Sequence, residues 1–265
     1  MKTLKTPLVF VLLVQSLVFA TSCKNENVEN GNGEKQVKEK STEERIFYER
    51  TLKDMVKNIP FIVHLKTVSR LRLTSSTTTA FFVDQRGYLV STRHGYSSDP
   101  KNDAAVVTFD NGESVPVRFV DEVQTLDLVV VATDKPVAFP VAKFANLQLI
   151  FARGKRYSGD ELEFKNSMVV VRCINENGTA PLNRIQVGEF LEWRKDWPVV
   201  EFLQLQQNSW GCSGAPIFNT GGEVIGMFRS VAGGAMFGTD ASSVSEAVKL
   251  IIEEDVKKKN QGGQQ

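Results

Sequence analysis

The chain has 265 residues, of which 42% are hydrophobic and 24% are charged, and its formal net charge is +1. This composition is typical of a globular protein with a large core in one or two domains. The near-zero net charge gives no indication of a nucleic acid or an acidic surface as a partner. The chain has only two histidines, His64 and His94, so a mechanism that needs a histidine base must use one of them.

The first residues have the pattern of a signal peptide. Lys2 and Lys5 supply a positive end, the run LVFVLLV at 8–14 is apolar, and small residues precede Cys23. We expect residues 1–22 to be removed on export. A cysteine directly after small residues resembles a bacterial lipoprotein signal, in which the thiol is acylated. We therefore expect a lipid anchor at Cys23 and a place in the cell envelope; the alternative is plain secretion with an incidental cysteine.

A tether is predicted at 23–44. Residues 24–40 mix Lys, Glu, Asn, Gly and Gln with only two valines, so they cannot bury enough apolar surface to fold. A flexible segment after a lipidated cysteine would hold a folded domain away from the membrane.

An amphipathic helix is expected to open the folded part of the chain. Ser41 and Glu44 have the spacing of a capping box. Ile46, Phe47, Leu52, Met55 and Val56 follow at roughly helical spacing, and Pro60 ends the helix.

Short strands are predicted from Phe61 onward, because runs rich in Val, Phe, Ile and Thr alternate with turn signals. The runs are FIVHLKTV, TTAFFVD, GYLVST, AAVVTFD, SVPVRFV and DLVVVAT, then VAFPVAKF, SMVVVRCI, RIQVGEFLEW, VVEFLQL, APIFN, EVIGMF and GAMFGTD. Regular strands without interleaved helices favour an all-β barrel or sandwich. SSVSEAVKLIIEEDVKK is expected to form a closing helix, and residues 257–265 a disordered tail.

Two further cysteines, Cys173 and Cys212, lie far apart in the sequence. An even number in an exported chain permits a disulfide. The separation gives little evidence of pairing, so we expect free thiols.

Ser213 stands in the stretch NSWGCSGAPIFNTGGEVIG, between small residues that favour a sharp turn. A serine nucleophile needs a base within hydrogen-bond reach, and backbone donors for the oxyanion that forms on attack. Glycines let consecutive N–H groups point into one cavity, and those of Gly211 and Ser213 are the natural pair. By itself this pattern favours a nucleophile and an ordinary turn about equally.

His94 is the better candidate for the base. It follows a predicted hairpin of two apolar strands, in FFVDQRGYLVSTRHG, at a position where rigid strands present a loop. His64 lies in the middle of a predicted strand and is expected to be a packed or surface residue.

Asp127 directly precedes an apolar strand in QTLDLVVVATD, so its carboxylate needs a buried partner. The N–H of a histidine ring would provide one and would fix the tautomer. Asp121 and Asp134 compete for this role, but they stand in more polar surroundings.

These motifs, STRHG, LDLVVVATD and GCSGAPIFNTGGEVIGMF, occur in the order His, Asp, Ser. In that order they resemble the trypsin/chymotrypsin superfamily of serine proteases, and the serine block is most similar to the bacterial Deg-type branch. The resemblance covers about residues 45–255. It implies two six-stranded antiparallel β-barrels flanked by an N-terminal and a C-terminal helix. The first barrel, with its helix, spans 45–135 and the second spans 136–256.

The resemblance also implies roles. Ser213 would be the nucleophile, His94 the general base and then acid, and Asp127 the residue that orients His94, with an oxyanion hole at Gly211 and Ser213. The strand Met227–Ser230, with Arg229, would pair with the substrate backbone. Gln207, Met227 and Phe228 would shape the first specificity pocket, with Phe237 and Gly238 as further candidates. Protein or peptide substrates are implied, without a cofactor or a metal.

Three residues depart from the family pattern. Cys212 stands where Asp or Asn is usual, Ala215 replaces a glycine, and Arg93 precedes the histidine. A nucleophilic Cys212 is rejected because the register puts Ser213 at the turn. Arg93 would disfavour the charged imidazolium if it lay close to His94.

Further expectations follow from the same resemblance. We expect no trypsin-style zymogen activation and no C-terminal peptide-binding domain. An acidic residue is not obvious in the pocket, so a hydrophobic or small residue is expected before the scissile bond. The alternative function is an inactive relative that binds extended peptide or an envelope protein.

Overall fold

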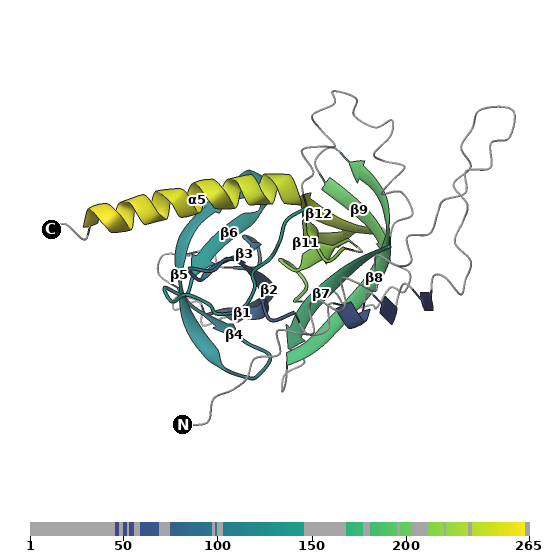
Figure 1. Cartoon of the computed structure of the whole chain (residues 1–265), viewed down its shortest axis with the longest axis horizontal. Coiled ribbons are helices and arrows are strands. Elements are labelled where there is room, and N and C mark those ends of the chain that lie inside the picture. Colours follow the sequence, from purple (N-terminus) through teal and green to yellow (C-terminus); the bar gives the residue numbers. More distant parts are fainter. Residues whose placement is uncertain are drawn as a thin grey trace, which may run out of the picture. The chain divides into compact units, whose positions relative to one another are not determined.

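Twelve strands and a long C-terminal helix form the described part of this computed structural model (Figure 1). The described residues are 46–47, 50–51, 53–55, 59–68, 75–96, 99, 103–145, 168–176, 181–194, 197–202, 211–219, 221–232 and 235–262, with backbone only at 168–202 and 231–236. They belong to one compact unit, Glu43–Gln265. The predicted signal peptide, Cys23, the tether and Gln207 lie outside the described residues.

Six antiparallel strands form a closed barrel in the order β1-β2-β3-β6-β5-β4. They are β1 Ile62–Val68, β2 Ser75–Asp84, β3 Tyr88–Thr92, β4 Ala104–Thr108, β5 Ser114–Val123 and β6 Leu128–Ala132. Pairing of β1 with β4 closes the circle. Every residue of β3 and β6 is buried: β6 is apolar throughout, and β3 is apolar up to Ser91 and Thr92. The predicted all-β fold and first barrel are confirmed.

The later strands pair in the order β10-β11-β12-β9-β8-β7, and β10 also pairs with β7. They are β7 Met168–Glu176, β8 Pro181–Arg194, β9 Trp197–Phe202, β10 Pro216–Phe218, β11 Val224–Ala232 and β12 Ala235–Asp240. An Asx turn at Asn219 joins β10 to β11, because the Asn219 side chain accepts the N–H groups of Gly221 and Glu223.

One predicted strand is absent. The run VAFPVAKF, residues 137–144, makes only an isolated bridge between Phe144 and Val224 within the described part of the chain. Pro140 cannot donate to a strand ladder, which explains the irregular path. Val137, Phe139 and Val141 still pack against the core.

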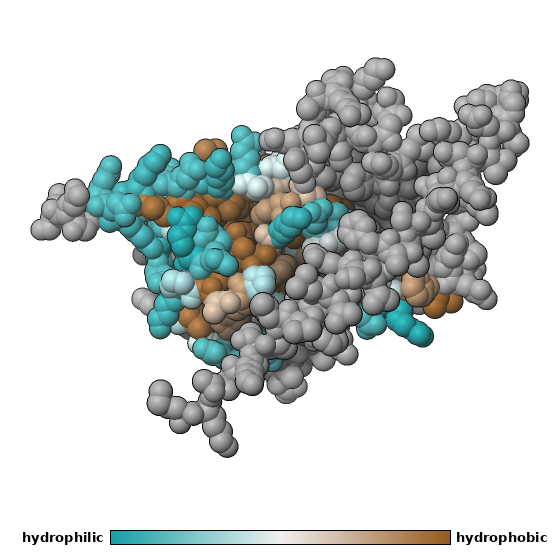
Figure 2. All heavy atoms as spheres, viewed as in Figure 1, coloured by the Kyte–Doolittle hydropathy of each residue, from teal (hydrophilic) through white to brown (hydrophobic). Residues whose placement is uncertain are grey.

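The C-terminal helix, α5, spans Ala241–Gly262. Asp240 caps its first turn by accepting the N–H of Ser243 at 2.9 Å. Val244, Val248, Ile251 and Ile252 join the hydrophobic core, which includes residues of the first barrel and of β10 and β11. The helix contacts β5, β6, β11 and β12. Figure 2 shows hydrophilic side chains on the outer surface where α5 lies, with apolar atoms beneath them.

The helix runs further than predicted, through residues assigned to a disordered tail. Lys258 pairs with Glu254 one turn earlier, and Lys259 reaches Asp134 of the first barrel at 2.7 Å. Lysines in the last turns also interact favourably with the helix dipole. These contacts explain why the segment from Lys257 to Gly262 stays helical.

The predicted N-terminal helix is described only in part. Ile46, Phe47, Arg50, Thr51 and Lys53–Met55 are helical. Ile46 and Phe47 are exposed, although their spacing predicted a buried face, whereas Met55 packs against the core. Among the described residues, no helix has the length and hydropathy needed to cross a bilayer.

Candidate active site

The turn after β3 holds His94. Its backbone is fixed on both sides, because Arg93 N–H donates to the Asp127 carbonyl and Tyr96 N–H donates to the Arg93 carbonyl. Hydroxyl groups of Thr67 and Ser76 donate to the carbonyls of Tyr96 and Gly95. The His94 side chain is half-exposed, so one edge of the ring faces Asp127 while the rest remains accessible.

Asp127 lies between a short 3-10 helix, Gln124–Leu126, and β6. Its backbone is left-handed, with φ of 52°, which is uncommon for a residue other than glycine. One carboxylate oxygen, Oδ1, accepts the N–H of His94 at 2.9 Å, and Oδ2 lies 2.6 Å from His94 Nδ1. Since a carboxylate only accepts, the ring proton belongs on Nδ1, which leaves Nε2 free to act as an acceptor.

The charge of Asp127 is well stabilised. Burial raises the pKa of its carboxyl, but hydrogen bonds from the His94 ring and N–H, with the charges of His94 and Arg229, outweigh burial and hold the pKa below its ordinary value. Asp127 therefore stays ionised at neutral pH.

Ser213 lies in a tight loop before β10, with its Oγ 3.0 Å from His94 Nε2. Gly211 and Gly214 on either side have φ of 83° and 84°. A side chain at Gly214 would bring Cβ within 2.2 Å of the Thr79 carbonyl oxygen, so only glycine fits there. The structure thus brings together the three predicted side chains, His94, Asp127 and Ser213.

Two threonines of β2 fix this loop, and sequence reasoning missed them. The hydroxyl of Thr78 donates to the Ser213 carbonyl, and the hydroxyl of Thr79 donates to the Gly211 carbonyl at 2.6 Å. The N–H of Thr79 also donates to the Ser213 carbonyl at 3.0 Å. The run of three threonines at 77–79 was the available signal, but it was interpreted only as a strand.

The two predicted oxyanion donors are available. Within the described part of the chain, the N–H groups of Gly211 and Ser213 have no acceptor, while the carbonyls of the same residues are held by β2. Backbone donors that are fixed in place but unused are what an oxyanion requires.

The side chain of Arg229 on β11 contacts Asp127. Its Nε–H donates to Asp127 Oδ2 at 3.2 Å, which leaves the predicted pairing of this strand's backbone with substrate untested. Met227 is fully buried in the core, and the backbone of Phe228 pairs with Gly214 and Ala215. Their predicted role in the first specificity pocket stays a prediction, because Gln207 and its neighbours lie outside the described residues. Phe237 and Gly238 pair with β11, and Phe237 is half-buried.

The three departures from the family pattern have structural explanations. Arg93 Nε lies 2.9 Å from Glu122 Oε1, so a carboxylate balances its charge beside His94. Ala215 donates its N–H to the Cys212 carbonyl and is fully buried. Cys212 is disulfide-bonded, which corrects the expected free thiol and excludes it as the nucleophile.

The other candidates for the acid and the base have different surroundings. Asp121 is exposed on β5, and Asp134 pairs with Arg118 and Lys259. His64 is buried on β1, in agreement with the expectation that it packs. Metal-binding side chains do not gather in groups of three or more among the residues that the structure describes.

The profile of the trypsin-like peptidase domain matches residues 78–227 of the chain, a range that begins in β2 and ends in β11. The chain belongs to this family. A similar solved structure is the serine endoprotease from Yersinia pestis, with a TM-score of 0.58 and 15% identity, over 82% of this chain and 68% of that chain. At that identity the match shows the shared fold. No curated protein matches the chain.

Membership of the trypsin-like peptidase family confirms the resemblance inferred from the sequence. The family match covers His94, Asp127 and Ser213, together with the two threonines of β2. The residues that hold the nucleophile loop therefore lie within the part of the chain that defines the family.

Proposed function

We propose that the chain is a serine endopeptidase that works through Ser213, His94 and Asp127. The observation that carries this proposal is the continuous contact from Ser213 Oγ through His94 to Asp127, at 3.0 Å and 2.6 Å. These distances are within hydrogen-bond reach of a general base and its orienting group.

The reaction proceeds in two halves. His94 Nε2 takes the Ser213 hydroxyl proton while Oγ bonds to the scissile carbonyl carbon, and the N–H groups of Gly211 and Ser213 stabilise the oxyanion. The C–N bond then breaks, and the imidazolium returns its proton to the leaving amine. In the second half, His94 takes a proton from water, which attacks the acyl carbon. The bond to Ser213 Oγ then breaks, Oγ recovers its proton, and the carboxylic acid product leaves. Asp127 stabilises the His94 imidazolium each time that it forms.

We propose that an extended peptide adds to the edge of β11. The backbone of Phe228 is already paired with the nucleophile loop, so we place the substrate strand beyond it, toward Ala232. On its other side β11 pairs with β12. Strand addition provides affinity through main-chain hydrogen bonds, which suits protein substrates of varied sequence.

The domain plan and location are also proposals. We take the strands β7–β12 to be the second barrel of a chymotrypsin-like fold, with the two barrels at 45–135 and 136–256. Their strand pairing order supports this division. The signal pattern and Cys23 support export and a lipid anchor in the cell envelope. Detergent-phase partitioning of the full chain, lost in Cys23→Ser, tests the anchor.

Labelling of the full chain with a fluorophosphonate probe tests the activity. We expect labelling of the native chain and none of Ser213→Ala. Ser114→Ala, which changes an exposed serine on β5, is the matched control and should label normally. A folded native chain that stays unlabelled and cleaves no peptide would contradict the proposal and favour the inactive peptide-binding relative.

A further inference from the structure

Arg229 brings a permanent positive charge to the carboxylate that orients His94. It projects from β11 and has 22% of its side chain exposed, while Asp127, its partner, has 11% exposed. The contact therefore joins a half-buried guanidinium to a nearly buried carboxylate, where solvent screening is weak.

The guanidinium and the imidazole share one oxygen. Asp127 Oδ2 accepts Arg229 Nε–H at 3.2 Å and lies 2.6 Å from His94 Nδ1. The second oxygen, Oδ1, accepts the backbone N–H of His94. With donors on both oxygens, the carboxylate has little freedom to rotate, so Arg229 helps to fix its orientation toward the ring.

The same charge opposes the imidazolium. Asp127 favours the protonated ring, and part of that effect is cancelled by a cation on the shared oxygen. Arg229 therefore favours the neutral ring over the charged ring, so the imidazolium formed during the reaction is stabilised less. Favouring the neutral ring widens the pH range of activity, whereas the weaker stabilisation of the imidazolium lowers the maximal rate.

Other charged groups near the pair do not reproduce this effect. From the turn after β3, Arg93 faces Glu122 of β5, and the two charges balance. From β12, Thr239 contributes only a neutral hydroxyl to the Leu126 carbonyl, and Asp240 caps α5. Of the charged groups in the described residues, His94 and Arg229 are the two that act on Asp127.

We propose that Arg229 is a positioning residue that holds Asp127 in line with His94 and extends activity toward lower pH. This inference rests on the proposed peptidase function. It assigns to Arg229 a role different from binding substrate, so removing the charge should change the pH profile more than KM.

The pH dependence of kcat/KM on a peptide substrate provides the test. Arg229→Met and Arg229→Gln remove the charge, and we expect both to move the midpoint of the acidic limb upward by about 0.5–1 pH unit. Arg229→Lys keeps the charge and should restore most of the native position. Arg86→Met removes an exposed arginine paired with Asp84 and should leave the midpoint unchanged.

A second measurement needs no activity. The titration of the His94 ring, followed by NMR in the native chain and in the same variants, should move in the same direction as the acidic limb. Neutral variants that fold but titrate like the native chain would overturn the role of Arg229. A chain that neither labels nor cleaves, but whose His94 ring still responds to Arg229, would contradict the peptidase function and leave standing only the positioning of Asp127 by Arg229.

Discussion

Thr79 of β2 donates its hydroxyl hydrogen to the carbonyl oxygen of Gly211, with 2.6 Å between the two oxygens. Its backbone N–H donates to the Ser213 carbonyl as well. One residue of the first barrel thereby holds the carbonyls of the two residues whose N–H groups are proposed to bind the oxyanion. The loop that carries Ser213 is therefore held in position by β2, a strand of the first barrel.

Thr79→Val should lower kcat with little change in KM. Valine keeps the branched shape in the strand but removes the hydroxyl that holds Gly211. A small displacement of the oxyanion donors should reduce kcat about 10- to 100-fold. Steady-state kinetics on a peptide substrate measure the effect. Thr108→Val, which removes an exposed hydroxyl on β4, is the control. An unchanged kcat in Thr79→Val would show that Thr79 does not position the oxyanion donors.

Asp127→Asn should reduce kcat by about 10⁴-fold, because the amide no longer stabilises the tautomer and charge that His94 needs. Asparagine tolerates the left-handed backbone at this position, so the variant should fold. Asp127→Ala adds backbone strain and should lose about 1–2 kcal/mol more stability than the asparagine variant. Chemical denaturation and kinetics separate the two effects. Undiminished turnover in Asp127→Asn would remove Asp127 from the mechanism.

Gly214→Ala should displace the nucleophile loop and abolish activity. Its Cβ would lie 2.2 Å from the Thr79 carbonyl oxygen and 2.4 Å from Ser91 Oγ. Gly112→Ala is the matched control, because Gly112 also has positive φ, 83°, but its Cβ would meet nothing within 4 Å. The control should lose only about 1–2 kcal/mol of stability and keep its activity. Equal activity losses in both variants would mean that strain, and not the clash, controls the loop.

The sequence predicted those features that depend on short stretches of chain. The hairpin around Gly87, the strand after Asp127 and the glycine-flanked turn at Ser213 each have a local signature, and their order supplied the family. The contacts of Thr78 and Arg229 have none. Thr78 stands 135 positions before Ser213, and Arg229 stands 102 positions after Asp127. Such contacts depend on how the strands fold together in space, which periodicity does not encode.

The effect of charged residues could also be predicted only in part from the sequence. Arg93 adjoins His94, and its charge was expected to disfavour the imidazolium. The pairing of β5 with β6 places the Glu122 carboxylate beside Arg93, and this carboxylate balances the arginine charge. From its composition alone, the segment 257–265 was expected to be disordered. The segment is helical to Gly262, and Lys259 contacts Asp134, a residue more than 100 positions earlier in the chain.

Cys212 is expected to be bonded to Cys173. The chain has three cysteines, and the proposed lipid anchor uses Cys23. β10 begins shortly after Cys212 and pairs Ile217 with Val171 of β7, the strand that contains Cys173. The side chain of Cys173 lies outside the described residues, so the pairing is a prediction. Peptide mapping by mass spectrometry without reduction should recover one linked pair from these two positions. Recovery of Cys23 in the linked peptide would contradict both the pairing and the lipid anchor.

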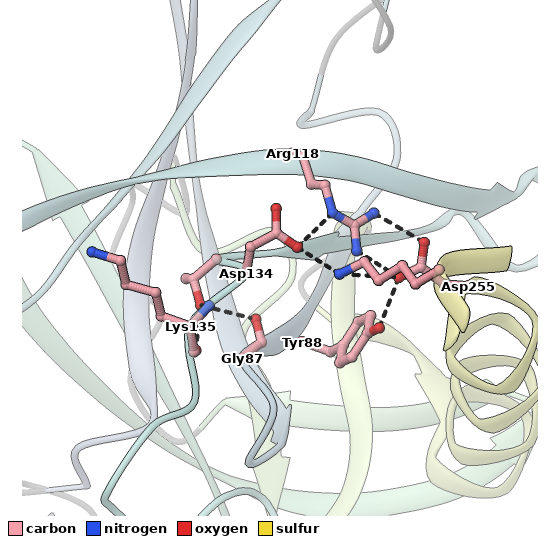
Figure 3. Close-up of polar contacts among 8 residues, drawn as sticks. Gly87, Tyr88, Arg118, Asp134, Lys135 and Asp255 are labelled. Atoms are coloured by element: carbon pink, nitrogen blue, oxygen red, sulfur yellow. Dashed lines mark hydrogen bonds and ion pairs between the residues drawn. The ribbon is translucent and has the colours of Figure 1, made fainter. Parts of the chain in front are cut away.

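An ionic cluster fastens α5 to the first barrel (Figure 3). Arg118 of β5 makes two hydrogen bonds to the Asp255 carboxylate, which also accepts the hydroxyl of Tyr88 at 2.7 Å. Burial raises the pKa of Asp255, but the bonds from Arg118 and Tyr88 outweigh it and leave the pKa below the ordinary 3.8. Burial and the bond to Asp255 raise the pKa of Tyr88 to about 12.

Asp255→Asn should lower the free energy of unfolding by about 1–3 kcal/mol at pH 7, because Arg118 loses the charge that it contacts. The folded pKa of Asp255 lies below the unfolded one, so its stabilising effect is complete above the ordinary 3.8 and disappears as the pH falls through the lower folded value. Urea denaturation at pH 7 and near pH 3 should show the native chain and the variant converging in acid. Glu253→Gln, which removes the same charge from an exposed position on the helix, is the control and should match the native chain at both pH values. A constant difference between Asp255→Asn and the native chain at both pH values would mean that packing, and not the charge of Asp255, holds α5 in place.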